Sequence, residues 1–291
     1  MFIETIKSLV HRTKYFPLWS ALAISQWRSF DARSRSLGKI FAAVMRWFPP
    51  AARSFDHEAS RVFPHMTRGA RAKLGQSMGN HMGRTLFELY HDAEFQTQNH
   101  KFRVSGPGLN ALKEVQENGK GAIIVSGHFG QWEAIRAVLK QNGMESGAII
   151  RTHKNPHYAR RIRLGIEAGG KPILATGRAG TTALVRHIRS GGIISILLDE
   201  KYSEGIRLPF LGLDALTSLS AAQLALKYDL PMIPAYGIRI DDENAVQVIF
   251  EAPIAHTDSV TMTRAFNDSL SARILANPDQ WYWLLKRWDG A

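Results

Sequence analysis

Residues 121–140 decide the fold, and they read Gly121-Ala-Ile-Ile-Val-Ser-Gly-His-Phe-Gly-Gln-Trp-Glu-Ala-Ile-Arg-Ala-Val-Leu-Lys140. The short apolar run that begins this stretch is typical of a buried strand, and the residues from 134 to 140 are good helix formers. We therefore expect His128 at a strand-to-helix turn, a place where side chains often project into a cleft. Glu133 is predicted near the start of the helix, where the helix dipole favours its negative charge.

The spacing of His128 and Glu133 suggests a catalytic pair. If the turn brings the two together, the carboxylate can bond one imidazole nitrogen and leave the other free to remove a proton from a hydroxyl. The alternative is a histidine at a strand end with ordinary hydrogen bonds, beside a solvated helix glutamate. The position at the end of a strand favours the catalytic interpretation.

Short strands alternate with helices after residue 102, which indicates an α/β fold with a mostly parallel mixed sheet flanked by helices. The expected strands are 121–126, 147–151, 193–198, 232–238 and 245–251. The expected helices in this part are 108–118, 131–141, 157–168, 180–190, 217–228 and 260–275. Before it, Thr67 is a suitable N-cap for a helix that continues to Leu89, and the N-terminal region is expected to be helical.

Composition limits the possible classes. The chain has 291 residues, 45% of them hydrophobic, so it can bury a full core and is not disordered. It has no cysteine, which excludes thiol catalysis and disulfides and fits a reducing compartment. The first apolar stretch, Tyr15 to Trp27, is shorter than the roughly 20 residues that span a bilayer. We expect a soluble or peripheral protein without a cleaved signal peptide.

The net charge of +12 is concentrated at the N-terminus, where residues 1–53 hold nine Lys or Arg against two acidic residues. Aromatic and aliphatic residues alternate with these cations, a composition that suits a membrane-surface segment. Alternatives are a basic helical pair packed on the core and a nucleic-acid patch; we favour the membrane surface and expect no nucleic acid. The predicted organisation is a basic amphipathic segment, 1–53, followed by a catalytic domain, 54–291.

Three further groups of residues are candidate ligands. His153 and His157 are four apart, but Pro156 disturbs the helix and a third ligand is missing, so we expect no metal. Arg178 stands beside glycines and threonines that open a helix, where a phosphate can bind backbone N–H groups; an ordinary glycine turn is the alternative. Asp199 and Glu200 follow an apolar run and are expected at the carboxyl end of a strand. They either pair with nearby arginines or orient a substrate, or they form a plain loop charge pair.

These motifs together resemble the bacterial lipid A biosynthesis (lauroyl/myristoyl) acyltransferase family, within the glycerolipid acyltransferase superfamily. The resemblance runs in order through Phe63-Pro64, the block 119–133 with its H-x4-E motif, Arg151 with Asn155-Pro156, Leu198-Asp199-Glu200, Leu208-Pro-Phe-Leu-Gly212 with Thr217, Asn277-Pro-Asp-Gln-Trp281 and Lys286-Arg-Trp288. It covers about residues 54 to 288, and no single short motif produces such a series.

The resemblance implies transfer of a fatty acyl group from acyl-acyl carrier protein to a hydroxyl of a lipid A precursor, without a cofactor. It implies His128 as general base oriented by Glu133, and it makes Arg151, Arg178 and Asp199 candidates for binding an anionic glycolipid acceptor. The implied location is the cytoplasmic face of the bacterial inner membrane. Two alternatives remain: a lysophospholipid or glycerol-phosphate acyltransferase that uses acyl-CoA, and a non-catalytic basic membrane-binding protein.

Overall fold

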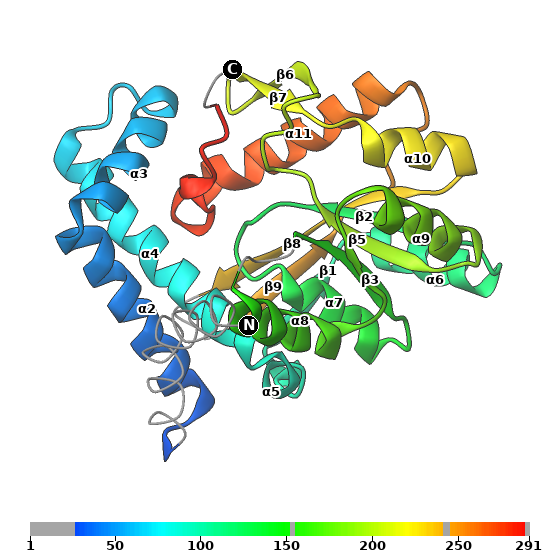
Figure 1. The fold of residues 1–291 in the computed structure, drawn as a ribbon, viewed down its shortest axis with the longest axis horizontal. Coiled ribbons are helices and arrows are strands. Elements are labelled where there is room, and N and C mark those ends of the chain that lie inside the picture. The colour runs from blue at the N-terminus through cyan, green and yellow to red at the C-terminus, as the bar shows by residue number, and fades with distance from the viewer. Residues whose placement is uncertain (1–26, 152–154, 241–244, 289–291) are drawn as a thin grey trace, which may run out of the picture.

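A single large sheet lies at the centre of the protein, in a computed structural model that describes residues 27–151, 155–240 and 245–288 (Figure 1). Its strands are β1 (Phe102–Ser105), β2 (Ala122–Ser126), β3 (Ser146–Ile150), β4 (Ile173–Ala175), β5 (Ile193–Leu197), β8 (Met232–Ile240) and β9 (Ala245–Phe250). The strand order is β1-β9-β8-β2-β5-β3-β4. Every neighbouring pair is parallel except β8 and β9, so the predicted mostly parallel mixed sheet is confirmed.

The five predicted strands are all present, and four further strands were not predicted. β1 and β4 have only four and three residues, too few for a visible pattern. The other two, β6 (Ile206–Phe210) and β7 (Leu213–Thr217), form a separate antiparallel hairpin. The helix predicted from residue 217 begins later, at Ser220, because Thr217 still pairs with Ile206 in this hairpin.

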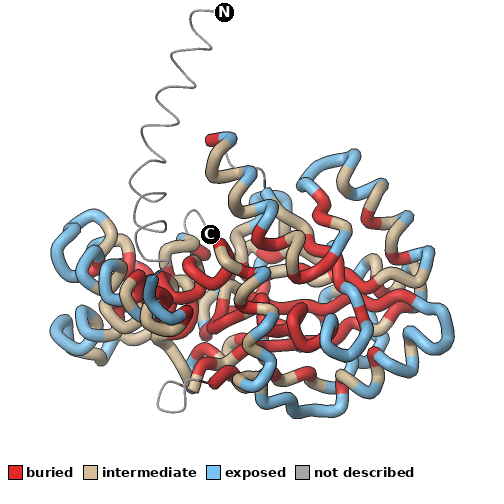
Figure 2. Tube along the Cα trace, turned by 90° about the horizontal axis from the view of Figure 1, so that it is seen from below, coloured by how far each residue is buried: buried red, intermediate tan, exposed pale blue. Residues whose placement is uncertain are grey.

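Helices cover both faces of the sheet. They are α6 (Gly108–Glu117), α7 (Glu133–Gln141), α8 (Pro156–Gly169), α9 (Arg178–Arg189), α10 (Ser220–Tyr228) and α11 (Ser259–Ala276). Side chains of β2 alternate between two cores, with Ile123 and Val125 in one and Ala122 and Ile124 in the other. This alternation is expected of a strand buried on both faces, and Figure 2 shows the strands as a band of buried residues through the centre of the molecule.

The N-terminal region is helical, as predicted. It contains α2 (Phe30–Trp47), α3 (Pro49–Val62), α4 (Arg68–Tyr90) and the short α5 (Asp92–Phe95), and α2 to α4 form one side of the molecule in Figure 1. Thr67 caps α4 as expected, since its hydroxyl accepts the Ala70 N–H at 3.2 Å. Gly83 allows α2 to lie close against α4, because a Cβ there would stand 2.7 Å from the Leu37 carbonyl oxygen.

Only part of the basic segment 1–53 can be compared with the structure. Residues 1–26 lie outside the described residues, and the expected boundary after residue 53 falls within α3. Over the three described ranges, no helix combines the length and the apolar composition needed to cross a bilayer.

Candidate active site

Two neighbouring parallel strands place His128 beside Asp199. β2 ends at Ser126 and β5 ends at Leu197, and these two residues are partners in the parallel ladder. The chain leaves both strands at the same edge of the sheet, where ligands bind in open α/β folds. His128 follows the first strand by two residues and Asp199 follows the second by two, so their side chains meet at this edge.

The Asp199 carboxylate is fixed by hydrogen bonds on both oxygens. Oδ1 lies 2.8 Å from Nδ1 of His128. Oδ2 accepts the backbone N–H of His128 at 2.7 Å and the indole N–H of Trp281 at 2.8 Å. An ionised carboxylate only accepts hydrogen bonds, so Nδ1 of His128 carries a proton and Nε2 of the neutral ring is left as an acceptor. This is the tautomer that a general base requires.

Local packing holds the imidazole in place. The ring of Trp132 lies edge-on to His128, with centroids 5.3 Å apart. Gly127 makes room for the carboxylate, because a Cβ at this position would lie 3.1 Å from Cγ of Asp199. The His128 side chain keeps 21% of its surface exposed, whereas that of Asp199 is completely buried. The pair therefore offers its basic nitrogen to a ligand while its acidic partner is shielded from water.

Burial and charge act in opposite directions on this pair. Burial alone lowers the pKa of His128, but the Asp199 charge and hydrogen bond outweigh it, and the net pKa lies above the ordinary value of 6.5. Burial raises the pKa of Asp199, but His128, Trp281 and the backbone N–H of residue 128 lower it further, to a net value below 3.8. Asp199 is thus ionised at neutral pH, and His128 becomes a base as pH rises through its elevated pKa.

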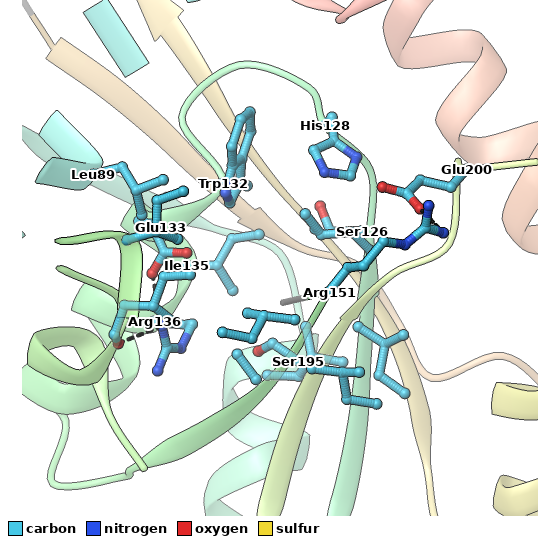
Figure 3. Close-up of a pocket in the computed structure, with 18 of the residues that line it drawn as sticks. Leu89, Ser126, His128, Trp132, Glu133, Ile135, Arg136, Arg151, Ser195 and Glu200 are labelled. Atoms are coloured by element: carbon cyan, nitrogen blue, oxygen red, sulfur yellow. Dashed lines mark hydrogen bonds and ion pairs between the residues drawn. The ribbon is translucent and has the colours of Figure 1, made fainter. Parts of the chain in front are cut away.

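The expected contact between Glu133 and His128 is absent. The Glu133 carboxylate instead accepts a hydrogen bond from Arg136 at 2.8 Å, and both side chains are almost fully buried. Figure 3 shows Glu133 directed toward Arg136, on the far side of Trp132 from His128. The reason is that α7 begins at Glu133, so its side chain lies along the helix, where residues three apart are neighbours. The carboxylate that contacts the imidazole is Asp199, which the sequence indicated as a substrate ligand.

Glu133 and Arg136 belong to a buried polar cluster beneath the turn. The Arg136 guanidinium donates to the carbonyl oxygens of Ser146, Ile166 and Gly170 at 2.7–3.2 Å. Burial and the nearby Glu133 charge raise the pKa of Asp92 to about 8, so it is mostly protonated at pH 7. The cluster links α7 to the start of β3 and the end of α8.

An apolar pocket of about 330 Å³ adjoins His128 (Figure 3). Its walls come from β2, β3, β5, α7 and α8. The polar lining residues include His128, the Glu133–Arg136 pair, Ser126, Ser195 and, at the rim, Arg151 and Glu200. The apolar lining residues include Leu89, Ile124, Ile135, Ala148, Ile162, Ile166 and Ile196. Pockets of this size and character bind hydrophobic ligands, with the few polar groups fixing orientation.

The predicted ligand Arg151 lies at the rim of this pocket. It is largely exposed and pairs with Glu200 at 3.1 Å, and both residues also line a second, more open hollow of about 430 Å³ with Lys201 and Lys286. Arg178 is elsewhere: it is exposed at the start of α9 and lines neither hollow. His153 lies outside the described residues, and within those ranges no group of three or more His, Asp or Glu side chains is arranged to hold a metal.

The C-terminal aromatic segment supports the turn from behind, a role that the motifs did not indicate. Besides the indole bond of Trp281, the Gly130 N–H donates to the Gln280 carbonyl at 2.8 Å and the Tyr282 N–H to the His128 carbonyl at 3.0 Å. Trp281 is fully buried. The three tryptophans between residues 281 and 288 indicate that this segment is buried, but they do not indicate which part of the chain it packs against.

This geometry can be compared with known proteins. The family model described as bacterial lipid A biosynthesis acyltransferase matches residues 12–289, nearly the whole chain. The chain belongs to this family. A lipid A biosynthesis acyltransferase of Haemophilus influenzae is 22% identical over 232 residues, which cover 77% of this chain and 71% of that protein. The family consists of enzymes that transfer acyl groups, so the resemblance seen in the motifs is confirmed at this level.

Proposed function

We propose that this acyltransferase moves a fatty acyl group from acyl-acyl carrier protein to a hydroxyl of a lipid A precursor, with His128 as general base. The observation that carries the proposal is the His128–Asp199 pair at the edge of an apolar pocket. A base next to a hydrophobic cavity is what transfer of an acyl chain to a hydroxyl requires. The family match and the relative in Haemophilus influenzae support lipid A as the product class.

In the proposed reaction, Nε2 of His128 removes the proton from the acceptor hydroxyl as its oxygen attacks the thioester carbonyl carbon. The tetrahedral intermediate collapses, the C–S bond breaks, and the leaving thiolate takes the proton from Nε2. The new bond is an ester and the histidine is regenerated. A positioned base of this kind typically contributes about 10²–10⁴-fold to the rate. The negative charge of Asp199 stabilises the imidazolium that forms between the two proton transfers.

The remaining site residues take supporting roles in this proposal. Asp199 orients His128, the task that the H-x4-E spacing suggested for Glu133. Glu133 anchors Arg136 and so holds the pocket wall at β3 and α8. Arg151, with Lys201 and Lys286 around the open hollow, supplies positive charge for phosphates of the acceptor or of the carrier's prosthetic group. The acyl chain occupies the apolar pocket.

We further propose that the enzyme binds the cytoplasmic face of the inner membrane peripherally through its N-terminal helices. Ile40, Val44 and Trp47 are exposed in the second half of α2, Trp47 by 73%, and Phe48, which follows the helix, is also exposed. Basic residues flank these positions, among them Lys39 and Arg46. Exposed apolar groups next to cations suit an interface with anionic lipids.

A donor–acceptor matrix tests the proposed reaction. Purified protein is incubated with acyl-acyl carrier protein or acyl-CoA, each against a lipid A precursor and a lysophospholipid. We expect the carrier-protein donor with the lipid A precursor to give the fastest turnover, and His128→Ala to lose most of it. Preference for acyl-CoA and lysophospholipid would overturn the substrate assignment, and a folded His128→Ala protein with normal turnover would overturn the mechanism.

A further inference from the structure

A further pocket, which shares no lining residue with the pocket beside His128, lies among the N-terminal helices. It has a volume of about 330 Å³ and is lined by the end of α2, the first turns of α3 and the first turns of α4. In Figure 1 these helices lie at one side of the sheet, away from α9 at the other side. Its apolar surfaces include the buried Met45 and Phe55, with Pro49 and Ala52.

Three arginines from three different helices line this pocket. Arg46 comes from α2, Arg53 from α3 and Arg68 from α4, and all three are exposed. None of them forms an ion pair with a carboxylate within the part of the chain that the structure describes. Asp56 is the one acidic residue that lines the pocket, and it forms an ion pair with Arg71, with 2.7 Å between Nε of Arg71 and Oδ1 of Asp56. The pocket therefore carries an uncompensated positive charge.

Charge and surroundings together identify the kind of ligand. Several arginines around one pocket, none of them paired with a carboxylate, suit a phosphate group, which a guanidinium binds through paired hydrogen bonds. The same end of α2 carries the exposed Val44 and Trp47, with Phe48 next in the chain, and the Arg46 guanidinium lies 4.8 Å from the Trp47 ring centroid. A ligand that satisfies both features has a phosphate joined to apolar chains.

We propose that this pocket binds the phosphate headgroup of an anionic glycerophospholipid in the membrane. The headgroup lies among Arg46, Arg53 and Arg68, and the acyl chains leave toward Trp47 and Phe48. The inference rests on the proposed peripheral membrane association and adds a specific lipid site to it, separate from the site where acyl transfer takes place. Such a site orients the enzyme on the bilayer, because it fixes three helices to one lipid.

The test compares two double variants of the full-length protein that lose the same number of charges. Arg53→Ala/Arg68→Ala removes two pocket arginines, and Arg186→Ala/Arg189→Ala removes two exposed arginines of α9 as the matched control. Binding is measured by co-sedimentation with vesicles of phosphatidylcholine alone or mixed with phosphatidylglycerol. A cation near an anionic surface contributes roughly a fivefold factor to binding, so the pocket variant should bind the mixed vesicles about 25-fold more weakly.

The control should lose at most a few-fold, and binding to pure phosphatidylcholine should change in neither variant. Equal losses in both variants would overturn the headgroup site and leave only a diffuse charge effect. Normal vesicle binding by the pocket variant, with lost binding of inorganic phosphate or of the carrier protein, would also overturn it. If the wild-type protein binds neither vesicle, membrane association itself is wrong; acyl transfer in detergent is assayed separately and should be unchanged in both variants.

Discussion

Replacing Asp199 with asparagine should inactivate the enzyme by inverting the tautomer of His128. Oδ2 of Asp199 accepts two N–H groups, from the His128 backbone and from Trp281, whereas Oδ1 faces only the imidazole. An asparagine must therefore place its carbonyl oxygen toward the two N–H donors and its NH₂ group toward Nδ1. Nδ1 then accepts, Nε2 carries the proton, and the base is lost.

The size of the effect follows from two losses. In the variant, the active tautomer of His128 carries its proton on Nδ1, which then faces the NH₂ group of the asparagine. These two buried donors have no acceptor between them, which costs about 1–3 kcal/mol. The forming imidazolium also loses its carboxylate partner, an attraction of about 4 kcal/mol for charges roughly 4 Å apart at a surface-like dielectric. Together they amount to about 5–7 kcal/mol, or about 10⁴–10⁵-fold. This sum reaches the whole of the roughly 10²–10⁴-fold that a general base contributes, so kcat should fall by about 10⁴-fold, similar to the loss seen for the corresponding change in a serine protease triad.

The assay is the pH dependence of kcat/KM, with the fold of each variant checked by near-ultraviolet circular dichroism. In the wild type, activity should rise through a pKa above 6.5, because His128 must lose its proton to act as a base. Asp199→Asn should reduce the rate and also move this rise to lower pH, since the carboxylate charge that raises the pKa of His128 is gone. Glu133→Gln is the matched control and should leave the rise in place. Activity of Asp199→Asn within tenfold of wild type, or a shift with Glu133→Gln instead, would refute the assignment of Asp199.

Three further predictions concern the pocket and its buried cluster. Glu133→Gln should lower the free energy of unfolding by about 1–3 kcal/mol, measured by urea denaturation, because a buried charge pair with Arg136 becomes a weaker hydrogen bond; an unchanged midpoint would contradict this. Asp92 holds its proton in the folded protein up to its pKa of about 8, whereas in the unfolded chain it ionises near pH 4. The free energy of unfolding should therefore fall as pH rises between these values, by up to about 1.4 kcal/mol per pH unit. Asp92→Asn should remove that slope in denaturation curves, and a slope identical to wild type would show that another group causes it. Ala148→Leu should fill part of the apolar pocket and exclude the end of a long acyl chain. Each methylene of the chain that is excluded should cost about 0.8 kcal/mol, which lowers kcat/KM roughly fourfold for long-chain donors only. An equal loss for short-chain and long-chain donors would place the acyl chain elsewhere.

The sequence alone was sufficient to predict the strand-to-helix turn at His128. The apolar run of β2 and the helix formers of α7 are local signals, and local signals are readable without knowledge of the partner strands. The same is true of the strand before Asp199. The prediction that both residues lie at carboxyl ends of strands was therefore correct.

The contact between His128 and Asp199 depends on a pairing that no local pattern contains. β3 follows β2 in the chain, yet β5 is inserted between them in the sheet. This order brings residues 128 and 199 together and sends Glu133 along α7 instead. Glu133 is close to His128 in the sequence and was therefore predicted as its partner. The order of the strands in the sheet instead places Asp199 in contact with His128. The Trp281 indole escaped prediction for the same reason, since its partner is 82 residues away.

Glu88 connects the N-terminal helices to the turn that carries His128. Its carboxylate is buried in α4, accepts the Ser34 hydroxyl of α2 at 2.8 Å and is paired with Arg239 of β8. It also accepts the Gln131 amide, and Gln131 in turn accepts the Glu133 N–H at 3.0 Å. Burial raises the pKa of Glu88 but Arg239 lowers it further, so the group is ionised. The helices proposed to meet the membrane and the turn that carries His128 are thus joined through one buried charge, that of Glu88.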